Sequence, residues 1–265
     1  MIEVIRCEKV GGLSNVRFSD GTVLYTKFHD FAVHDAYFRY IYSHYDVDKI
    51  PTPDPTIWKD YSLHKLYADN LLRLNIKKEI KDKLLKKYPI KEGDVVVEVG
   101  AFQGFGTVRL AKKVGPKGRV IAIEPDEMNF AMLCKNIHEN KIYNVTPINK
   151  GVYKEEGEQK LYKMGKHPQS LGLHKVTRKT YQLIKVDTID NILRGIRPDY
   201  VILTINLGEY DAILGMNSSL SRGPRLFITG HNKTYSQKIK RHLTLYNYQS
   251  FIGPKYKVYS YHGEL

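Results

Sequence analysis

The chain shows two hydrophobic patterns in alternation from about residue 90 onward. Short continuous apolar runs predict buried strands, and they lie at residues 95–99, 120–124, 145–149, 200–205 and 225–229. The stretches between them carry apolar residues at helical spacing, as at Phe130, Leu133, Cys134 and Ile137. Strands that alternate with helices in this way predict a doubly wound α/β fold with a mostly parallel sheet.

Further strands are predicted outside these five runs. Residues 157–187 suggest strands around a basic loop. Near the end of the chain, the runs at 248–252 and 256–261 are separated by Gly253-Pro254, a pair that predicts a turn. These two runs are expected to form an antiparallel hairpin at one edge, which brings the expected sheet to seven strands.

Residues 1–88 do not follow this alternation. They are expected to form an N-terminal extension that packs on a core domain of residues 89–265. Weak alternation and glycine turns predict short strands in residues 1–28. Residues 29–55 read as a cap or lid, and residues 56–88 predict one or two helices.

The first core strand leads into a glycine-rich turn, and the second ends on the carboxylate of Glu124. The turn reads Glu98-x-Gly100-x-x-x-Gly104-x-Gly106, which is wider than the Gly-x-Gly-x-x-Gly of dinucleotide folds. An acid inside the strand would repel a pyrophosphate but suits a cationic ligand, and the chain has no Gly-Lys-Ser/Thr phosphate loop. S-adenosylmethionine carries an ammonium, a sulfonium and a ribose but no phosphate, so it is the expected cofactor. Glu124 is expected to accept hydrogen bonds from its ribose hydroxyls.

Four segments together resemble the FkbM family of S-adenosylmethionine-dependent methyltransferases. They are Glu98-Val-Gly-Ala-Phe-Gln-Gly-Phe-Gly, Gly118-Arg-Val-Ile-Ala-Ile-Glu-Pro-Asp, Asn136-Ile-His-Glu-Asn and Asn144-Val-Thr-Pro-Ile-Asn-Lys-Gly-Val. The resemblance covers about residues 90–232 and implies a class I, Rossmann-like enzyme that methylates a hydroxyl of a sugar or other small molecule. The expected cofactor-binding residues are Glu98, Gly100, Ala101, Phe102, Gly104, Gly106, Glu124, Pro125, Asn149 and Gly151.

The chain departs from the family pattern on both sides of the expected site. Glu98 and Phe102 stand where the family usually has Asp and Asn. After the fourth core strand, only Glu209 aligns with the acid-rich family motif, as its final Glu. His231 matches a family His, but Thr229-Gly230 replaces the Glu that usually precedes it.

Residues at the carboxyl ends of the core strands face the crevice in which such sheets bind ligands. Those candidates are Asn206, Glu209, Asp211 and His231. We expect His231 to act as base or orienter and Glu209 to contact the acceptor, with Asn206 beside them. The alternative for His231 is a structural histidine that bonds a loop carbonyl.

Positive charge is concentrated toward the end of the chain. The net charge is +14, and no acidic residue occurs between Asp211 and Glu264. Lysines and arginines there alternate with aromatics that could stack on bases, namely Tyr235, Tyr246, Tyr248, Phe251, Tyr256, Tyr259 and Tyr261. A small-molecule or glycan acceptor is therefore the first hypothesis, RNA methylation the second, and cofactor binding without catalysis the third.

The remaining signals bear on location and metals. Cys7 and Cys134 lie far apart, which favours a reduced, cytoplasmic protein. The N-terminus lacks a basic segment followed by an apolar one, and no apolar run approaches 18 residues, so neither export nor a membrane span is expected. The histidines and aspartates of residues 29–48 match no metal motif, so no metal is expected. No pattern predicts an oligomeric state.

Overall fold

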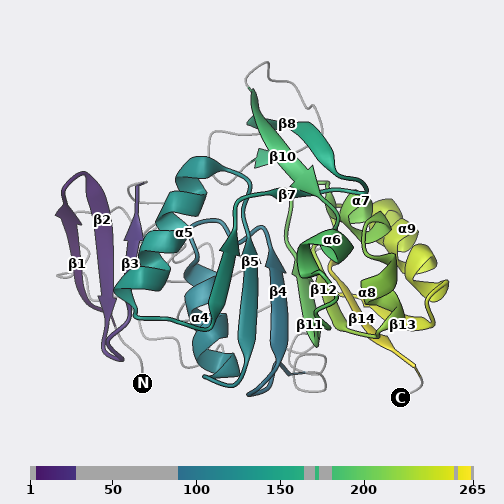
Figure 1. The fold of residues 1–265 in the computed structure, drawn as a ribbon, viewed down its shortest axis with the longest axis horizontal. Helices are drawn as coiled ribbons and strands as arrows, with labels where there is room; N and C mark the ends of the chain where they lie inside the picture. The colour runs from purple at the N-terminus through teal and green to yellow at the C-terminus, as the bar shows by residue number, and fades with distance from the viewer. Residues whose placement is uncertain (1–3, 28–88, 164–170, 173–180, 254–255, 264–265) are drawn as a thin grey trace.

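The structure is a computed structural model that describes residues 4–27, 89–163, 171–172, 181–253 and 256–263 (Figure 1). Its central element is a seven-stranded sheet with the order β13-β14-β12-β11-β4-β5-β6. Neighbouring strands pair in parallel, except in the two pairs that β14 makes. The predicted parallel sheet with a terminal antiparallel hairpin is confirmed. The strands are β4 (Val95–Val99), β5 (Arg119–Ile123), β6 (Val145–Ile148), β11 (Tyr200–Leu203), β12 (Arg225–Ile228), β13 (Tyr248–Ile252) and β14 (Val258–His262).

Helices cover both faces of this sheet, so the strands are apolar at successive positions rather than at alternate ones. Val96 points into a core that includes residues of α4 (Phe105–Val114) and α5 (Glu127–Glu139). The next residue, Val97, points into the opposite core. That second core takes residues from α6 (Ile189–Leu193), α7 (Glu209–Leu214), α8 (Asn217–Ser221) and α9 (Lys233–Thr244).

The N-terminal residues form a separate antiparallel sheet of β1 (Val4–Val10), β2 (Leu13–Phe18) and β3 (Val23–Thr26). β3 lies beside α5 and joins this sheet to the core (Figure 1). The lid and the helices expected at residues 29–88 lie outside the described residues.

A third sheet has the order β7-β10-β8-β9 and is inserted between β6 and α6. Gln182 on β10 donates from Nε2 to Asp126 Oδ2 at 3.0 Å, which ties this sheet to the residue that caps α5. The strands are β7 (Gly151–Val152), β8 (Gly157–Lys163), β9 (Leu171–Gly172) and β10 (Tyr181–Asp187).

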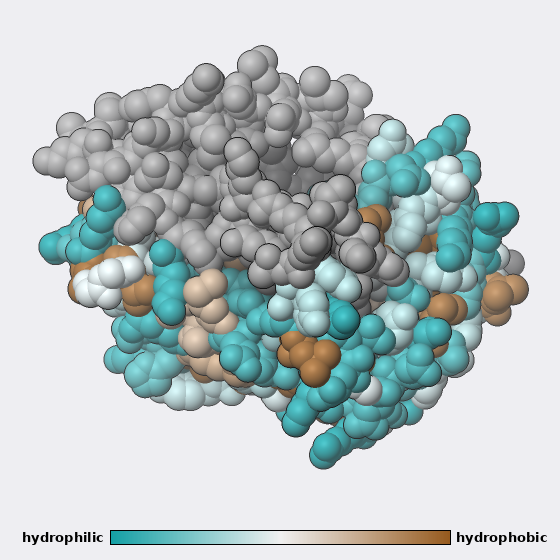
Figure 2. All heavy atoms as spheres, turned by 90° about the horizontal axis from the view of Figure 1, so that it is seen from above, coloured by the Kyte–Doolittle hydropathy of each residue, from teal (hydrophilic) through white to brown (hydrophobic). Residues whose placement is uncertain are grey.

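On one face of the molecule, the surface of the described residues is mainly polar (Figure 2). On the face shown in Figure 2, hydrophilic residues predominate and the hydrophobic ones form small separate patches. None of the helices that the structure describes is long and apolar enough to cross a membrane.

Candidate functional site

The glycine-rich turn lies between the end of β4 and the start of α4, where it passes close to two other segments. Gly100 has φ +85°, and a Cβ there would lie 2.6 Å from the Thr204 carbonyl oxygen. Gly104 has φ +83°, and a Cβ there would lie 2.6 Å from Leu133 Cδ1. Both positions require glycine for their backbone conformation and for space. The turn is therefore held against the residues that follow β11 and against α5.

Glu98 lies beneath this turn on β4 and is 7% exposed. Its Oε2 accepts a hydrogen bond from the Thr107 hydroxyl at 2.5 Å. A Cβ on Gly106 would lie 2.5 Å from Glu98 Oε1, so the third glycine leaves room for the carboxylate. The side chain thus places a carboxyl group at the N-terminal turn of α4. That turn has no side-chain cap and no acidic residue of its own.

Glu124 follows β5 and joins it to the glycine-rich turn. Its Oε2 accepts from the Phe102 N–H at 2.9 Å, and its Oε1 accepts from the Asp126 N–H at 3.0 Å. Burial raises the pKa of Glu124 to about 7, against the opposing effect of these two hydrogen bonds. The carboxylate lies where it was predicted, at the carboxyl end of the second core strand.

The other expected cofactor residues do not all lie at the glycine-rich turn. Asn149 follows β6 and donates from Nδ2 to the carbonyl oxygens of Glu124, at 2.9 Å, and Pro125, at 3.2 Å, so it joins the ends of β5 and β6. Ala101 and Phe102 are buried within the turn. Gly151 lies apart in β7, where a Cβ would lie 2.8 Å from Ile184 Cδ1, so its small size serves packing against β10.

Two buried amides behind Glu124 were not among the expected residues. Asn129 hydrogen-bonds the Glu124 side chain, which lowers the pKa of that carboxyl. Gln103 donates from Nε2 to Asn129 Oδ1 at 3.3 Å. A sequence signal existed for Asn129, because it is the third residue after an Asp that can cap a helix, and Asp126 Oδ1 does accept its N–H at 2.8 Å.

The candidate catalytic residues lie where β11 and β12 end. Glu209 begins α7 and is fully buried, whereas the His231 side chain is 23% exposed. His231 Nε2 lies 3.0 Å from Glu209 Oε1 and 3.1 Å from Oε2. Asn206 is half-buried in the same loop as Glu209. The structure thus brings His231 and Glu209 into contact, and His231 is the member of the pair that reaches the surface.

Tyr235 completes this cluster from the first turn of α9. Its hydroxyl has two acceptors within reach of its one proton, the Leu207 carbonyl oxygen at 3.0 Å and Glu209 Oε2 at 3.2 Å, and it accepts from the Tyr210 N–H at 3.0 Å. Burial raises the pKa of Tyr235 far above neutrality, so the hydroxyl keeps its proton. The sequence places this residue among possible base-stacking aromatics, but the structure assigns its hydroxyl to the Glu209 carboxylate.

Proton placement in the cluster follows from its surroundings. The hydrogen bond to Glu209 raises the pKa of His231, and burial raises the pKa of Glu209. When both groups are charged, His231 Nε2–H donates to the carboxylate. The Leu207 N–H lies 3.0 Å from the same nitrogen and donates to it when the ring is neutral with its proton on Nδ1. A hydrogen bond with the backbone of Ile205 also raises the pKa of His231, so the ring is tied to the loop that follows β11, as the alternative reading of a structural histidine expects.

The cofactor candidates at the glycine-rich turn and the cluster around Glu209 lie at the same end of the sheet, beyond the carboxyl ends of its parallel strands. β4 and β11 are adjacent parallel strands, and the Thr204 N–H donates to the Val99 carbonyl oxygen at 3.0 Å. The glycine-rich turn follows Val99, and the loop to Glu209 follows Thr204. This end of the sheet therefore carries two features. One is the glycine-rich turn with Glu124, at β4 and β5, which we call the cradle. The other is the cluster of His231 and Glu209, at β11 and β12.

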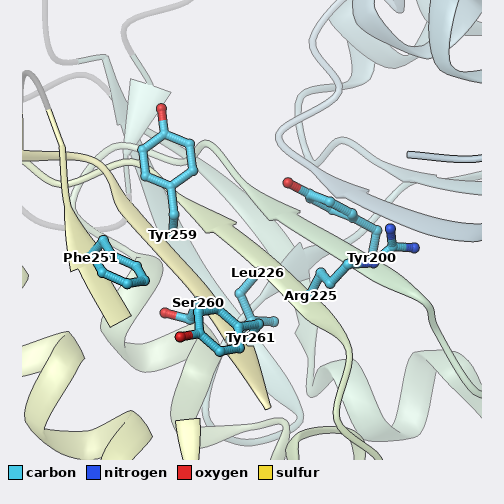
Figure 3. A pocket seen from close by; sticks show the side chains of 7 residues that line it. All are labelled: Tyr200, Arg225, Leu226, Phe251, Tyr259, Ser260 and Tyr261. Atoms are coloured by element: carbon cyan, nitrogen blue, oxygen red, sulfur yellow. The ribbon is translucent and has the colours of Figure 1, made fainter. Parts of the chain in front are cut away.

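A pocket lies on the same sheet but at the other end of the strands (Figure 3). Tyr200 and Arg225 are the first residues of β11 and β12, whereas Glu209 and His231 come after the last residues of these strands. The pocket is therefore separated from the candidate site by the length of a strand. It is lined by Tyr200, Arg225, Leu226, Phe251, Tyr259, Ser260 and Tyr261.

Three of the seven C-terminal aromatics are buried, two are half-buried and two are exposed. Tyr248, Tyr259 and Tyr261 are buried, and the Tyr248 hydroxyl donates to the Pro224 carbonyl oxygen at 3.0 Å. Phe251 and Tyr256 are exposed. Three of the rings proposed for base stacking are therefore not available at the surface.

The described residues contain no group of three or more His, Cys, Asp or Glu side chains placed to hold a metal. The histidines and aspartates of residues 29–48 lie outside this part of the chain.

A family model described as the methyltransferase FkbM domain matches residues 98–250, which is more than half of the chain. The chain belongs to this family. The matched segment of the FkbM domain contains every candidate residue from Glu98 to His231, and it leaves out β1 to β3.

Two curated proteins are similar to parts of this FkbM-family chain. A tRNA(Phe) (4-demethylwyosine(37)-C(7)) aminocarboxypropyltransferase from Methanocaldococcus jannaschii is 31% identical over 47% of the chain and 51% of its own length. A demethylmenaquinone methyltransferase from Lactobacillus johnsonii is 26% identical over 39% of the chain and 43% of its own length. The chain thus spans about half the length of the curated relatives that it matches.

Solved structures with a similar arrangement include a methyltransferase from Geobacter sulfurreducens and a SAM-dependent methyltransferase from Aquifex aeolicus. The first has a TM-score of 0.47 and 16% identity, and the match covers 84% of this chain and 96% of that one. The second has a TM-score of 0.43 and 19% identity, and the match covers 79% and 98%.

Proposed function

We propose that the protein binds S-adenosylmethionine and transfers its methyl group to a hydroxyl of a small molecule or sugar. The observation that carries this proposal is that the glycine-rich turn, which is held by Glu124, and the partly exposed His231 of the Glu209 cluster follow the same ends of the parallel strands. Such a layout gives one ligand a nucleoside site and gives a second ligand a place beside a titratable ring.

The residues at the cradle fit the proposed cofactor. A carboxylate offers about four acceptor positions, so the protein donors around Glu124 leave capacity for a ribose hydroxyl. The glycine-rich turn would hold the methionyl end of the cofactor, because Gly100 and Gly104 have no side chains and let a ligand approach the backbone. Glu98 lies beneath that turn and supplies negative charge for the ammonium. When bound, the sulfonium would supply an electrophilic methyl carbon.

The cluster at β11 and β12 supplies the acceptor side of the proposal. Methyl transfer is an in-line displacement, so orientation of the acceptor provides much of the acceleration. In the neutral form whose Nε2 proton is hydrogen-bonded to Glu209, His231 would accept the hydroxyl proton at its other ring nitrogen, Nδ1. Fully buried Glu209 reaches the acceptor only through His231, so its role would be to orient the ring and stabilise its charged form. Tyr235 would hold Glu209 in turn.

An RNA acceptor is the second candidate. It is favoured by the 31% identity with a tRNA-modifying enzyme and by the acid-free stretch between Asp211 and Glu264. The burial of Tyr248, Tyr259 and Tyr261 removes much of its stacking surface. The name of the same relative also raises transfer of an aminocarboxypropyl group instead of a methyl group.

The test uses S-adenosylmethionine labelled separately in the methyl group and in the carboxyl carbon. The protein is incubated with fractionated cell extract, with and without RNase, and with His231→Ala as a control. We expect the methyl label alone to enter an RNase-resistant small-molecule fraction.

Other outcomes would contradict this proposal in distinct ways. Methyl label in an RNase-sensitive fraction would support the RNA reading, and carboxyl label in the product would show aminocarboxypropyl transfer. Saturable cofactor binding without transfer of either label would leave a cofactor-binding protein without catalysis. Glu124→Ala checks the cradle, because the ribose assignment requires its cofactor affinity to fall.

A further inference from the structure

Asn136 on α5 contacts two otherwise separate parts of the molecule. Its Oδ1 accepts from the Tyr25 N–H at 2.6 Å, and its Nδ2 donates to the Tyr25 carbonyl oxygen at 3.0 Å. The same Nδ2 donates to the Gln103 carbonyl oxygen at 2.7 Å. Tyr25 belongs to β3 and Gln103 to the glycine-rich turn, and Asn136 is fully buried between them. One carboxamide therefore joins the N-terminal sheet to the cofactor cradle.

Asn140, one helical turn later, makes the sheet contact without the cradle contact. Its Oδ1 accepts from the Val23 N–H at 2.9 Å, and its Nδ2 donates to the carbonyl oxygens of Val23, at 2.6 Å, and Asn136, at 2.7 Å. Four helical residues advance about 6 Å and two strand residues about 6.8 Å, so side chains on successive turns meet alternate residues of β3. Each carboxamide carries a donor and an acceptor, as a backbone unit does. Together the two carboxamides hydrogen-bond the backbone N–H and carbonyl groups of Val23 and Tyr25 along one edge of β3.

The contact at Gln103 continues to the carboxylate of Glu124 by two routes. The Gln103 side chain bonds Asn129, which hydrogen-bonds Glu124. Through the backbone, the neighbouring residue Phe102 donates its N–H to Glu124 Oε2 at 2.9 Å. Gln103 and Asn129 are both buried, so neither can exchange its partner for bulk water without opening the site.

We propose that Asn136 is a positioning residue that couples docking of the N-terminal sheet to binding of the cofactor, with Gln103 and Asn129 linking it to Glu124. The inference rests on the proposed function, because it requires the cradle to bind S-adenosylmethionine. Coupling between two sites is reciprocal. If the docked sheet strengthens cofactor binding, the cofactor must strengthen docking of the sheet by the same factor.

The test compares Asn136→Ala with Asn140→Ala in the full chain. Both variants lose two hydrogen bonds to the edge of β3, and only Asn136→Ala also loses the bond to the glycine-rich turn. Calorimetric titration with S-adenosylmethionine should show about a tenfold loss of affinity in Asn136→Ala, which is the size expected for one buried hydrogen bond. Affinity in Asn140→Ala should stay close to that of the wild type. If either variant does not fold, Asn136→Ser and Asn140→Ser replace the pair.

Hydrogen exchange supplies the reciprocal measurement. The cofactor should slow exchange in the peptide that contains the Tyr25 N–H in the wild type and in Asn140→Ala, and have little effect there in Asn136→Ala. A purely structural role for Asn136 would produce the same cofactor response in both variants.

The outcomes separate the inference from the function on which it rests. Equal affinities in the two variants, or equal cofactor-induced protection of β3, would overturn the coupling while leaving the proposed function in place. Absence of saturable binding in the wild type would overturn the proposed function and the coupling with it.

Discussion

The two halves of the site are built from different parts of the chain. At β4 and β5, the site is formed mainly by the backbone. The N–H groups of Phe102 and Asp126 hold Glu124, and the conformation of the turn depends on glycine. At β11 and β12, side chains hold side chains, in the contacts of His231 and Tyr235 with Glu209. A cradle formed by backbone groups should tolerate substitution of most neighbouring side chains but not of its glycines. A side-chain cluster can be changed one group at a time, so single substitutions can separate the contributions of its members.

The largest expected effect on activity is at His231. His231→Ala should reduce turnover by about 10²–10⁴-fold, the usual contribution of a general base, and leave cofactor affinity unchanged. The measurement is kcat beside a calorimetric cofactor titration, and His138→Ala, at an exposed helix position, is the control. Unchanged turnover would assign His231 the structural role and weaken the contrast between the two halves.

The same cluster predicts a pH profile. A base must be neutral to act, and Glu209 raises the pKa of His231 above the ordinary 6.5. Turnover should therefore rise with pH through a midpoint above that value, and Glu209→Gln should move the midpoint to lower pH because the stabilising charge is gone. A midpoint that stays in place in Glu209→Gln would remove the carboxylate from this role.

In the cradle, the sharpest test is Gly100→Ala. The methyl group would lie 2.6 Å from the Thr204 carbonyl oxygen at φ +85°, so the free energy of unfolding should fall by about 3 kcal/mol. Gly93→Ala is the matched control, because Gly93 has the same φ of +85° with nothing within 4 Å of the added Cβ. It should lose only about 1 kcal/mol. Equal losses in urea unfolding would show that the close approach to Thr204 does not constrain the turn.

A smaller effect concerns the charge of Glu124. Its pKa is raised from 4.5 to about 7 in the folded protein, so the folded state holds this proton more tightly than the unfolded state. The resulting contribution to stability is fully present below pH 4.5 and is lost as the pH rises through about 7. Relative to Glu124→Gln, which does not titrate, the cofactor-free wild type should lose stability across that window. Parallel stabilities of the two proteins in urea unfolding from pH 4.5 to 7.5 would contradict the raised pKa.

The smallest expected effect is at Tyr235. Tyr235→Phe removes one hydrogen bond to Glu209, and the carboxylate keeps its contact with His231, so turnover should fall by about three- to tenfold. Cofactor affinity should not change, since the cradle does not contact this hydroxyl. A loss as large as that of His231→Ala would show that the cluster acts as one unit.

Much of the fold could be read from local patterns. The core strands fall within a residue or two of their predicted ranges, because each is an apolar run buried on both faces. Glu98, Glu124 and the glycines could also be predicted, because their spacing within one strand–turn–helix–strand unit is a local signal. Roles that depend on distant segments could not be read. Tyr235 reaches Glu209 across 26 positions, and Asn136 reaches Tyr25 across 111.

The amino-acid sequence by itself determined the order of strands and helices, the nucleotide-type turn and the family, because these follow from periodicity and from short spacings along the chain. The tertiary structure alone decided that Glu209 is fully buried against His231, that Tyr248, Tyr259 and Tyr261 are buried, and that Asn136 connects the N-terminal sheet to the cradle. The physical reason is that hydrogen-bond partners and burial depend on which segments meet in space, and a pattern along one segment does not contain its neighbours.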